Sequence, residues 1–73
     1  SAGQGATTTV NAANEIAVSA FLNGKIGFTD IYKINAQTLE AATYTNVQSL
    51  DEILECDKLA RISASEFITK VAH

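Results

Sequence analysis

The sequence has no proline, tryptophan or methionine, and only one cysteine and one histidine among its 73 residues. The single cysteine, Cys56, excludes a framework of internal disulfides and is typical of a reducing compartment. No apolar run approaches the ~18 residues of a membrane span, and no signal-peptide pattern is present. Five Lys and Arg residues, scattered singly and outnumbered by eight Asp and Glu residues, argue against nucleic acid or anionic membranes as partners. We therefore expect a soluble, cytoplasmic protein made of one small domain or part of one.

Residues 10–22 carry the strongest pattern in the chain. On a helix with about 100° per residue, Glu15, Ser19 and Asn23 form one narrow polar strip, and nearly every other position is apolar. The apolar arc is roughly twice the ~100° that a surface helix needs. This helix is therefore predicted to be covered on more than one side and to be the element against which the others pack. The apolar positions are Val10, Ala13, Ile16, Ala17, Val18, Ala20, Phe21 and Leu22.

Two amides, Asn11 and Asn14, fall inside this apolar arc. A buried amide without a hydrogen-bond partner costs about 1–3 kcal/mol. The structural interpretation is that both bind loop backbone and fix neighbouring helix ends. The functional alternative is a substrate-binding amide pair.

Local signals predict an all-α fold of three antiparallel helices. Thr7 or Thr8 is expected to cap the first helix, which ends where Gly24 adopts a left-handed conformation. Thr29 or Asp30 caps the second helix. The expected helices cover about residues 8–23, 30–42 and 50–71.

The link after the first helix and the start of the third carry further signals. Ile26 and Phe28 are too apolar for a solvated loop and are predicted to turn inward and close one end of the bundle. Ser49 and Glu52 form a capping box at the start of the third helix. Leu59 and Ile62 point away from the core and suggest a second contact surface. The predicted core stripe of this helix is Leu50, Ile53, Leu54, Cys56, Ala60, Ala64, Phe67, Ile68 and Val71.

Candidate chemical groups are few, and each has a structural interpretation. His73 is the last residue and lacks the enclosed setting that a catalytic histidine needs, and Cys56 is expected to be a small buried core residue. Asp57 is expected to pair with Arg61 one turn later. The acidic residues at the start of the third helix favour its positive end rather than a metal site; they are Asp51, Glu52, Glu55 and Asp57. The residues therefore indicate no catalytic, cofactor-binding or metal-binding site.

Residues 10–18 read V-N-A-A-N-E-I-A-V, and residues 20–31 read A-F-L-N-G-K-I-G-F-T-D-I. Farther on, residues 49–54 read S-L-D-E-I-L and are followed by a D-x-x-A-R pattern that ends at Arg61. In this order they resemble the C-terminal region of 1-deoxy-D-xylulose 5-phosphate reductoisomerase. That family carries L-N-A-A-N-E-(I/V)-A-V, then A-F-L-x-x-x-I-x-F-x-D-I, then a capped last helix. The departures are mild, with Val10 in place of the usual Leu and Thr8 where many members have Pro.

The resemblance implies that the chain is a fragment, the structural C-terminal domain of a bacterial oxidoreductase. The parent enzyme converts 1-deoxy-D-xylulose 5-phosphate to 2-C-methyl-D-erythritol 4-phosphate in the non-mevalonate pathway of isoprenoid biosynthesis. It uses NADPH and Mg²⁺ or Mn²⁺, and its cofactor-binding and metal-binding motifs match no position here. The implied partner is the catalytic domain of the same polypeptide, and the fragment alone is expected to be non-catalytic.

The family's domain is a four-helix bundle, whereas three helices are predicted here. The resemblance therefore implies that residues 1–73 are a single helical domain without the first bundle helix, which would precede Gly5. Its absence predicts uncovered apolar surface and a tendency of the fragment to self-associate.

Two other classes of function stay open from the sequence. The first is a freestanding interaction module that docks a partner through Leu59, Ile62 and the open side of the first helix. The second is a carrier protein modified at Ser49, because residues 48–51 (Q-S-L-D) look like the D-S-L-D of acyl carrier proteins. The missing Asp, the single long helix that follows and the capping role of Ser49 count against the carrier.

Overall fold

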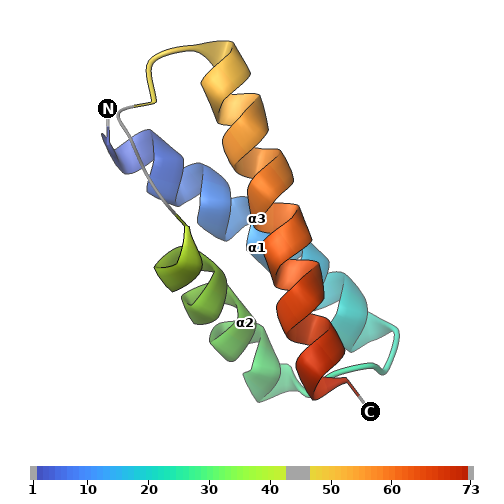
Figure 1. Ribbon diagram of the computed structural model, residues 1–73. Coiled ribbons are helices and arrows are strands. Elements are labelled where there is room, and N and C mark those ends of the chain that lie inside the picture. The colour runs from blue at the N-terminus through green and yellow to red at the C-terminus, as the bar shows by residue number, and fades with distance from the viewer. Residues whose placement is uncertain (1, 43–46, 73) are drawn as a thin grey trace.

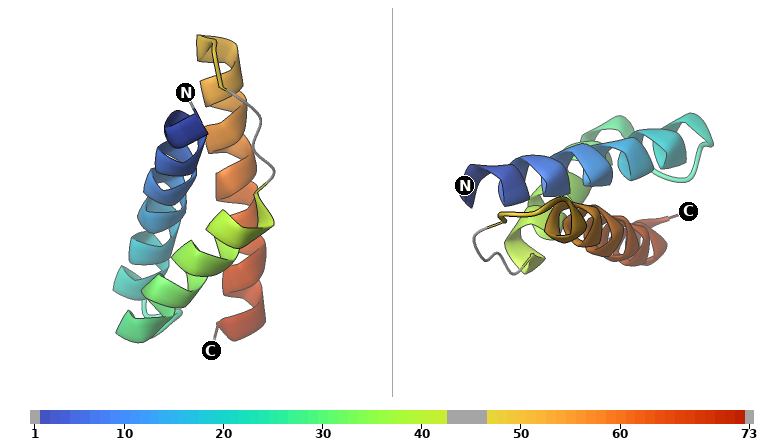
Figure 2. Two further views of the ribbon diagram at one scale, coloured as in Figure 1. Left: turned by 90° about the vertical axis from the view of Figure 1, so that its left-hand side faces the viewer. Right: turned by 90° about the horizontal axis from the view of Figure 1, so that it is seen from above.

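The computed structural model describes residues 2–42 and 47–72, which form three packed helices. They are α1 (Ala2–Leu22), α2 (Phe28–Ala41) and α3 (Leu50–Val71), and no strand occurs in the described ranges. Helices α1 and α3 run side by side, and the shorter α2 crosses them on one face (Figures 1 and 2). The predicted all-α fold is confirmed. None of the described helices has both the length and the apolar character of a membrane span.

Helix α1 begins at Ala2, earlier than the predicted start near residue 8. The Gly- and Thr-rich segment at residues 4–9 is helical, so neither Thr7 nor Thr8 caps α1. Burial explains the difference, because Gly5 and Thr9 are both buried and the Gly5 carbonyl oxygen lies 4.0 Å from Cys56 Sγ of α3. Tertiary packing overrides the weak helix propensity of these residues.

The turn after α1 follows the prediction for Gly24. This residue has φ of +74°, its N–H donates to the Phe21 carbonyl at 3.0 Å, and the Lys25 N–H donates to the Ala20 carbonyl at 2.9 Å. Together these bonds form a Schellman motif, which satisfies carbonyls that the helix end leaves without intrahelical partners.

Helix α2 begins at Phe28, so the predicted caps Thr29 and Asp30 lie inside its first turn. Gly27 is the N-cap, and its backbone N–H donates to Asp30 Oδ2 at 2.8 Å. Ile26 is buried, as predicted, whereas Phe28 is 60% exposed. The prediction for Phe28 was wrong because this residue opens α2 and sets its ring edge-on against Phe21, with centroids 5.7 Å apart.

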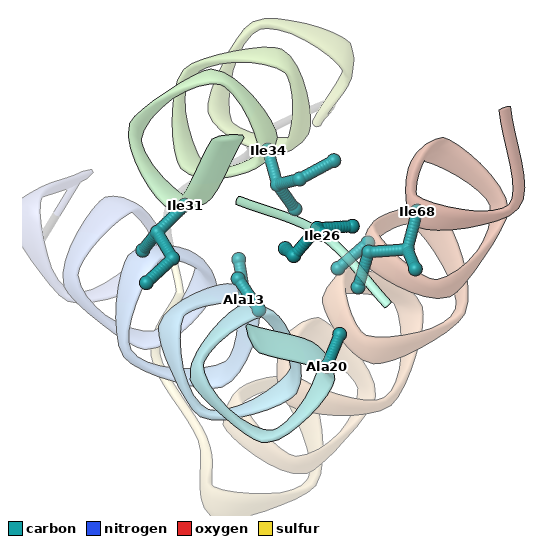
Figure 3. Packing of buried hydrophobic residues seen from close by; sticks show 8 residues of the cluster. Ala13, Ala20, Ile26, Ile31, Ile34 and Ile68 are labelled. Atoms are coloured by element: carbon teal, nitrogen blue, oxygen red, sulfur yellow. The ribbon is translucent and has the colours of Figure 1, made fainter. Parts of the chain in front are cut away.

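The core is built on small residues of α1. Ala13 and Ala17 are fully buried, as is Ala64 of α3, and the isoleucines of the link, α2 and α3 converge on this alanine surface (Figure 3). Small side chains let the helix backbones approach closely, which leaves the larger isoleucines to fill the space between the three helices. The buried cluster consists of Ala13, Ala17, Ala20, Ile26, Ile31, Ile34, Ala64 and Ile68.

The helical pattern overstated burial at the ends of the bundle. Leu22 is 75% exposed, and Leu50 and Leu54, predicted to be core residues, are 70% and 59% exposed. The first turns of α3 extend beyond the start of α1 (Figure 2), so no neighbouring helix covers them there. The predicted polar strip of Glu15 and Ser19 on α1, continued by Asn23, is exposed.

The alanine surface gives a direct test of the packing. We predict that Ala17→Leu lowers the free energy of unfolding by about 1–3 kcal/mol, because the added atoms have no space between the helices. Ala36→Leu, at an exposed position of α2, is the matched control and changes stability by less than ~0.5 kcal/mol. Urea unfolding followed by circular dichroism measures both, and equal stability of the two variants would contradict the close packing.

Candidate functional site

An ion-pair network joins α1 and α3. Arg61 Nε donates to Asp57 Oδ1 at 2.6 Å, as predicted for this i, i+4 pair, and Arg61 Nη2 donates to Glu15 Oε1 at 3.3 Å. The pKa of Arg61 is raised, mainly by the hydrogen bond to Asp57, while desolvation opposes the shift and Glu15 adds to it. A raised pKa on a basic group removes its stabilising contribution only as the pH rises through that pKa. Arg61 therefore stays charged at every working pH, and its ion pairs with Asp57 and Glu15 persist over that range.

Ser49 is the N-cap of α3, as predicted. Its Oγ accepts from the Glu52 N–H at 3.2 Å and donates to Glu52 Oε1 at 3.1 Å. The same carboxylate oxygen accepts from the Gln48 N–H at 3.1 Å. In a standard capping box this carboxylate accepts from the backbone N–H of the N-cap residue itself. The Ser49 hydroxyl, which a carrier protein would modify, is therefore hydrogen-bonded to Glu52 in the N-cap of α3.

The other candidate groups do not converge. In the part of the chain that the structure describes, no group of three or more His, Cys, Asp or Glu side chains could hold a metal ion. Cys56 is half-buried at the edge of the core, rather than fully buried as predicted. His73 lies outside the described residues.

The two asparagines of α1 behave differently from the prediction. Both Asn11 and Asn14 are exposed, so neither is the buried amide that its place in the apolar arc predicted. Asn14 Oδ1 accepts from Asn35 Nδ2 of α2 at 3.0 Å, so its partner is a side chain of the neighbouring helix rather than loop backbone. Asn35 was not among the predicted site residues, although an amide next to the apolar Ile34 is a visible signal in the sequence.

The described helices leave two apolar surfaces uncovered. On α3, Leu59 and Ile62 are 53% and 47% exposed, as their position off the predicted stripe indicated. Leu59 borders a groove of about 210 Å³ between α2 and α3. On the other side of α2, Phe28 and Tyr32 are exposed and stack edge-to-face, with centroids 6.2 Å apart. The arrangement suits binding to protein, since exposed apolar patches of this kind mark interaction sites.

Comparison with known proteins identifies the family of this chain. A family model described as the DXP reductoisomerase C-terminal domain matches residues 1–63. The chain belongs to this family. The resemblance of residues 10–31 and 49–61 is therefore confirmed.

The relatives of this DXP reductoisomerase C-terminal domain are much longer proteins. The 1-deoxy-D-xylulose 5-phosphate reductoisomerase of Photobacterium profundum is 54% identical over 70 residues, which cover 96% of this chain and 18% of that protein. The same enzyme from Proteus mirabilis is 49% identical over 69 residues, or 94% of this chain and 17% of its own length. The chain thus spans less than a fifth of the length of the curated relatives it matches.

A solved structure supports the same relationship. It is 1-deoxy-D-xylulose 5-phosphate reductoisomerase from Zymomonas mobilis in complex with NADPH, at a TM-score of 0.80 and 48% identity. The match covers 84% of this chain and 16% of that one. The three-helix arrangement of the DXP reductoisomerase C-terminal domain therefore also occurs inside a complete NADPH-binding protein.

The Ser49 cap generates a prediction for this domain. Ser49→Ala removes the acceptor for the Glu52 N–H and is expected to lower the free energy of unfolding by about 1 kcal/mol. Ser65→Ala, at an exposed interior position of the same helix, is the control and should not destabilise, because alanine is the better helix former. Thermal unfolding followed by far-UV circular dichroism, which reports helix content, measures both variants. Equal melting temperatures for wild type and Ser49→Ala would contradict the capping role.

Proposed function

We propose that residues 1–73 are the non-catalytic, structural C-terminal domain of a 1-deoxy-D-xylulose 5-phosphate reductoisomerase. The complete polypeptide would convert 1-deoxy-D-xylulose 5-phosphate to 2-C-methyl-D-erythritol 4-phosphate with NADPH, in the cytoplasm of a bacterium. The observation that supports this is the family match over residues 1–63, together with relatives about five to six times as long as the matched segment.

The polar side chains of the domain support a structural role because the prominent ones hold helices together or cap them. Arg61 joins α3 to α1 through Glu15, Asp30 accepts the N–H of the N-cap Gly27 at the start of α2, and Ser49 caps α3. Each of these groups stabilises the helices on which the domain is built. The domain would act on the enzyme by packing against the catalytic part of the same polypeptide.

The divalent metal that this family implies does not fit the described residues, because Asp51 and Glu55 lie on a different side of α3 from Asp57. Asp51 and Glu55 are one helical turn apart on the same side, whereas the helical spacing places Asp57 on the core-facing side. We assign no step to a metal or to NADPH here. In the proposal both belong to the part of the polypeptide outside residues 1–73.

The uncovered apolar surface on α3 supports a second candidate, a freestanding interaction module. Leu59 and Ile62 present about half of their surface to solvent beside the groove at Cys56. In that case the chain would bind a protein partner without belonging to an enzyme polypeptide. The carrier-protein alternative has its own test, which is incubation with coenzyme A and a phosphopantetheinyl transferase. A carrier protein would gain mass at Ser49.

A turnover assay tests the proposed function. The 73-residue chain mixed with 1-deoxy-D-xylulose 5-phosphate, NADPH and Mn²⁺ is expected to oxidise no NADPH, whereas the complete polypeptide that carries it does. The measurement is the loss of NADPH absorbance at equal molar concentrations. NADPH oxidation by the chain alone would overturn the non-catalytic role, and no turnover by the complete polypeptide would overturn the assignment to a reductoisomerase.

A further inference from the structure

Helices α1 and α2 carry a set of uncharged side chains that we call the amide face. It consists of Asn14 and Val18 on α1, and Phe28, Tyr32 and Asn35 on α2. Asn14 and Val18 are 4 residues apart, and the α2 residues are spaced by 4 and then 3, so each set lies on one side of its helix. The two sets are joined where Asn35 Nδ2 donates to Asn14 Oδ1 at 3.0 Å.

The aromatic end of this face is preorganised. Phe28 packs edge-on against Phe21 with centroids 5.7 Å apart, and Tyr32 packs on Phe28 in turn. Tyr32 is nevertheless 69% exposed and Phe28 60% exposed. Large aromatic rings held in place but left exposed are typical of the energetically important residues at protein interfaces.

The other end of the face contains a polar atom with no hydrogen-bond partner among the described residues. Asn35 Oδ1 is buried and accepts no hydrogen bond from any described residue. Buried polar atoms in folded proteins are nearly always hydrogen-bonded, so a donor that reached Asn35 Oδ1 would stabilise the domain. Asn35 as a whole is only half-buried, and the broad torsional freedom of its terminal amide lets the oxygen turn toward the surface.

We propose that the amide face is where this domain docks onto the remainder of the reductoisomerase polypeptide. The docking segment would carry apolar side chains against Val18, Phe28 and Tyr32, and one N–H or O–H donor directed at Asn35 Oδ1. This inference rests on the proposed function, because it takes its occupant from the polypeptide outside residues 1–73.

The length of the relatives favours this occupant. More than four fifths of each curated relative lies outside the segment that this chain matches, so a large body of protein must meet the domain somewhere. Interfaces between domains of one chain bury about 600–1,500 Å², which requires a continuous surface. The amide face offers uncharged area together with a hydrogen-bond acceptor that still requires a donor. Among the described residues, the surface at Leu59 and Ile62 has no buried polar atom without a partner, which distinguishes it from the amide face.

Hydroxyl-radical footprinting of the wild-type protein tests the docking without any substitution. The oxidation rates of Tyr32 and Phe28 are compared between the 73-residue chain and the complete enzyme. Both rates are expected to fall by about fivefold or more in the complete enzyme, as a change from mostly exposed to interface core requires. Leu59 and Ile62 serve as internal controls and should change by less than about twofold, because they remain at the surface.

A matched pair of variants provides a second measurement. Tyr32→Glu places a charge on the amide face, and Leu59→Glu places one at a similarly exposed position of α3. In the complete enzyme Tyr32→Glu should lower the melting temperature and increase protease release of the C-terminal domain, whereas Leu59→Glu should do neither. In the 73-residue chain both variants should melt as the wild type does, which shows that the helices themselves are intact.

Three results would overturn the inference. The first is equal oxidation of Tyr32 and Phe28 in the chain and in a complete enzyme that turns over substrate, which leaves the proposed function standing. The second is protection of Tyr32 in the isolated chain together with a dimer mass by light scattering, which assigns the face to a second copy. The third is protection of Leu59 and Ile62 in place of the aromatic pair.

Discussion

The contact between the alanine surface of α1 and its two neighbours is the interaction on which the structure depends. Ala13 and Ala17 are fully buried, and α1 packs against both α2 and α3, while the isoleucines of those helices and of the link fill the centre (Figure 3). A chain of this size buries only about 60% of its unfolded surface. Close helix contact is therefore the main means by which so short a chain encloses a core.

The other stabilising features act at the ends of this contact. The Schellman motif at Gly24 ends α1 and returns the chain so that buried Ile26 closes the bundle. The Ser49 cap starts α3, and Arg61 joins α3 to the outer side of α1 through Glu15. Many of the charged and hydroxyl side chains of the domain thus cap helices or join them. This agrees with the proposed supporting role in a larger enzyme.

The sequence predicted features whose cause is local. The α3 limits, the Ser49 cap, the left-handed Gly24 and the Asp57–Arg61 pair each follow from residues a few positions apart, and all four are found in the structure. Features that depend on a neighbouring helix were harder to predict. The start of α1 at Ala2 depends on burial of Gly5, and exposure of Leu50 and Leu54 depends on where α1 begins.

The amide pair shows the same limit at the candidate site. Asn14 stood out because an amide interrupts an apolar arc, but its partner Asn35 is 21 residues away on another helix. Helical periodicity gives the side of a helix on which a residue lies, and it does not give the residue opposite. The identity of the family followed from long ordered motifs, which carry far more information than the few groups of chemical interest.

Native-state hydrogen exchange tests the central role of α1 most directly. If the alanine surface organises the fold, the amides of residues 13–20 in α1 exchange most slowly, and only through global unfolding. Those of α2 should exchange faster, because α2 is shorter and crosses one face of the α1–α3 pair. Amides of α1 that exchange as fast as those of α2, through local opening, would contradict this account.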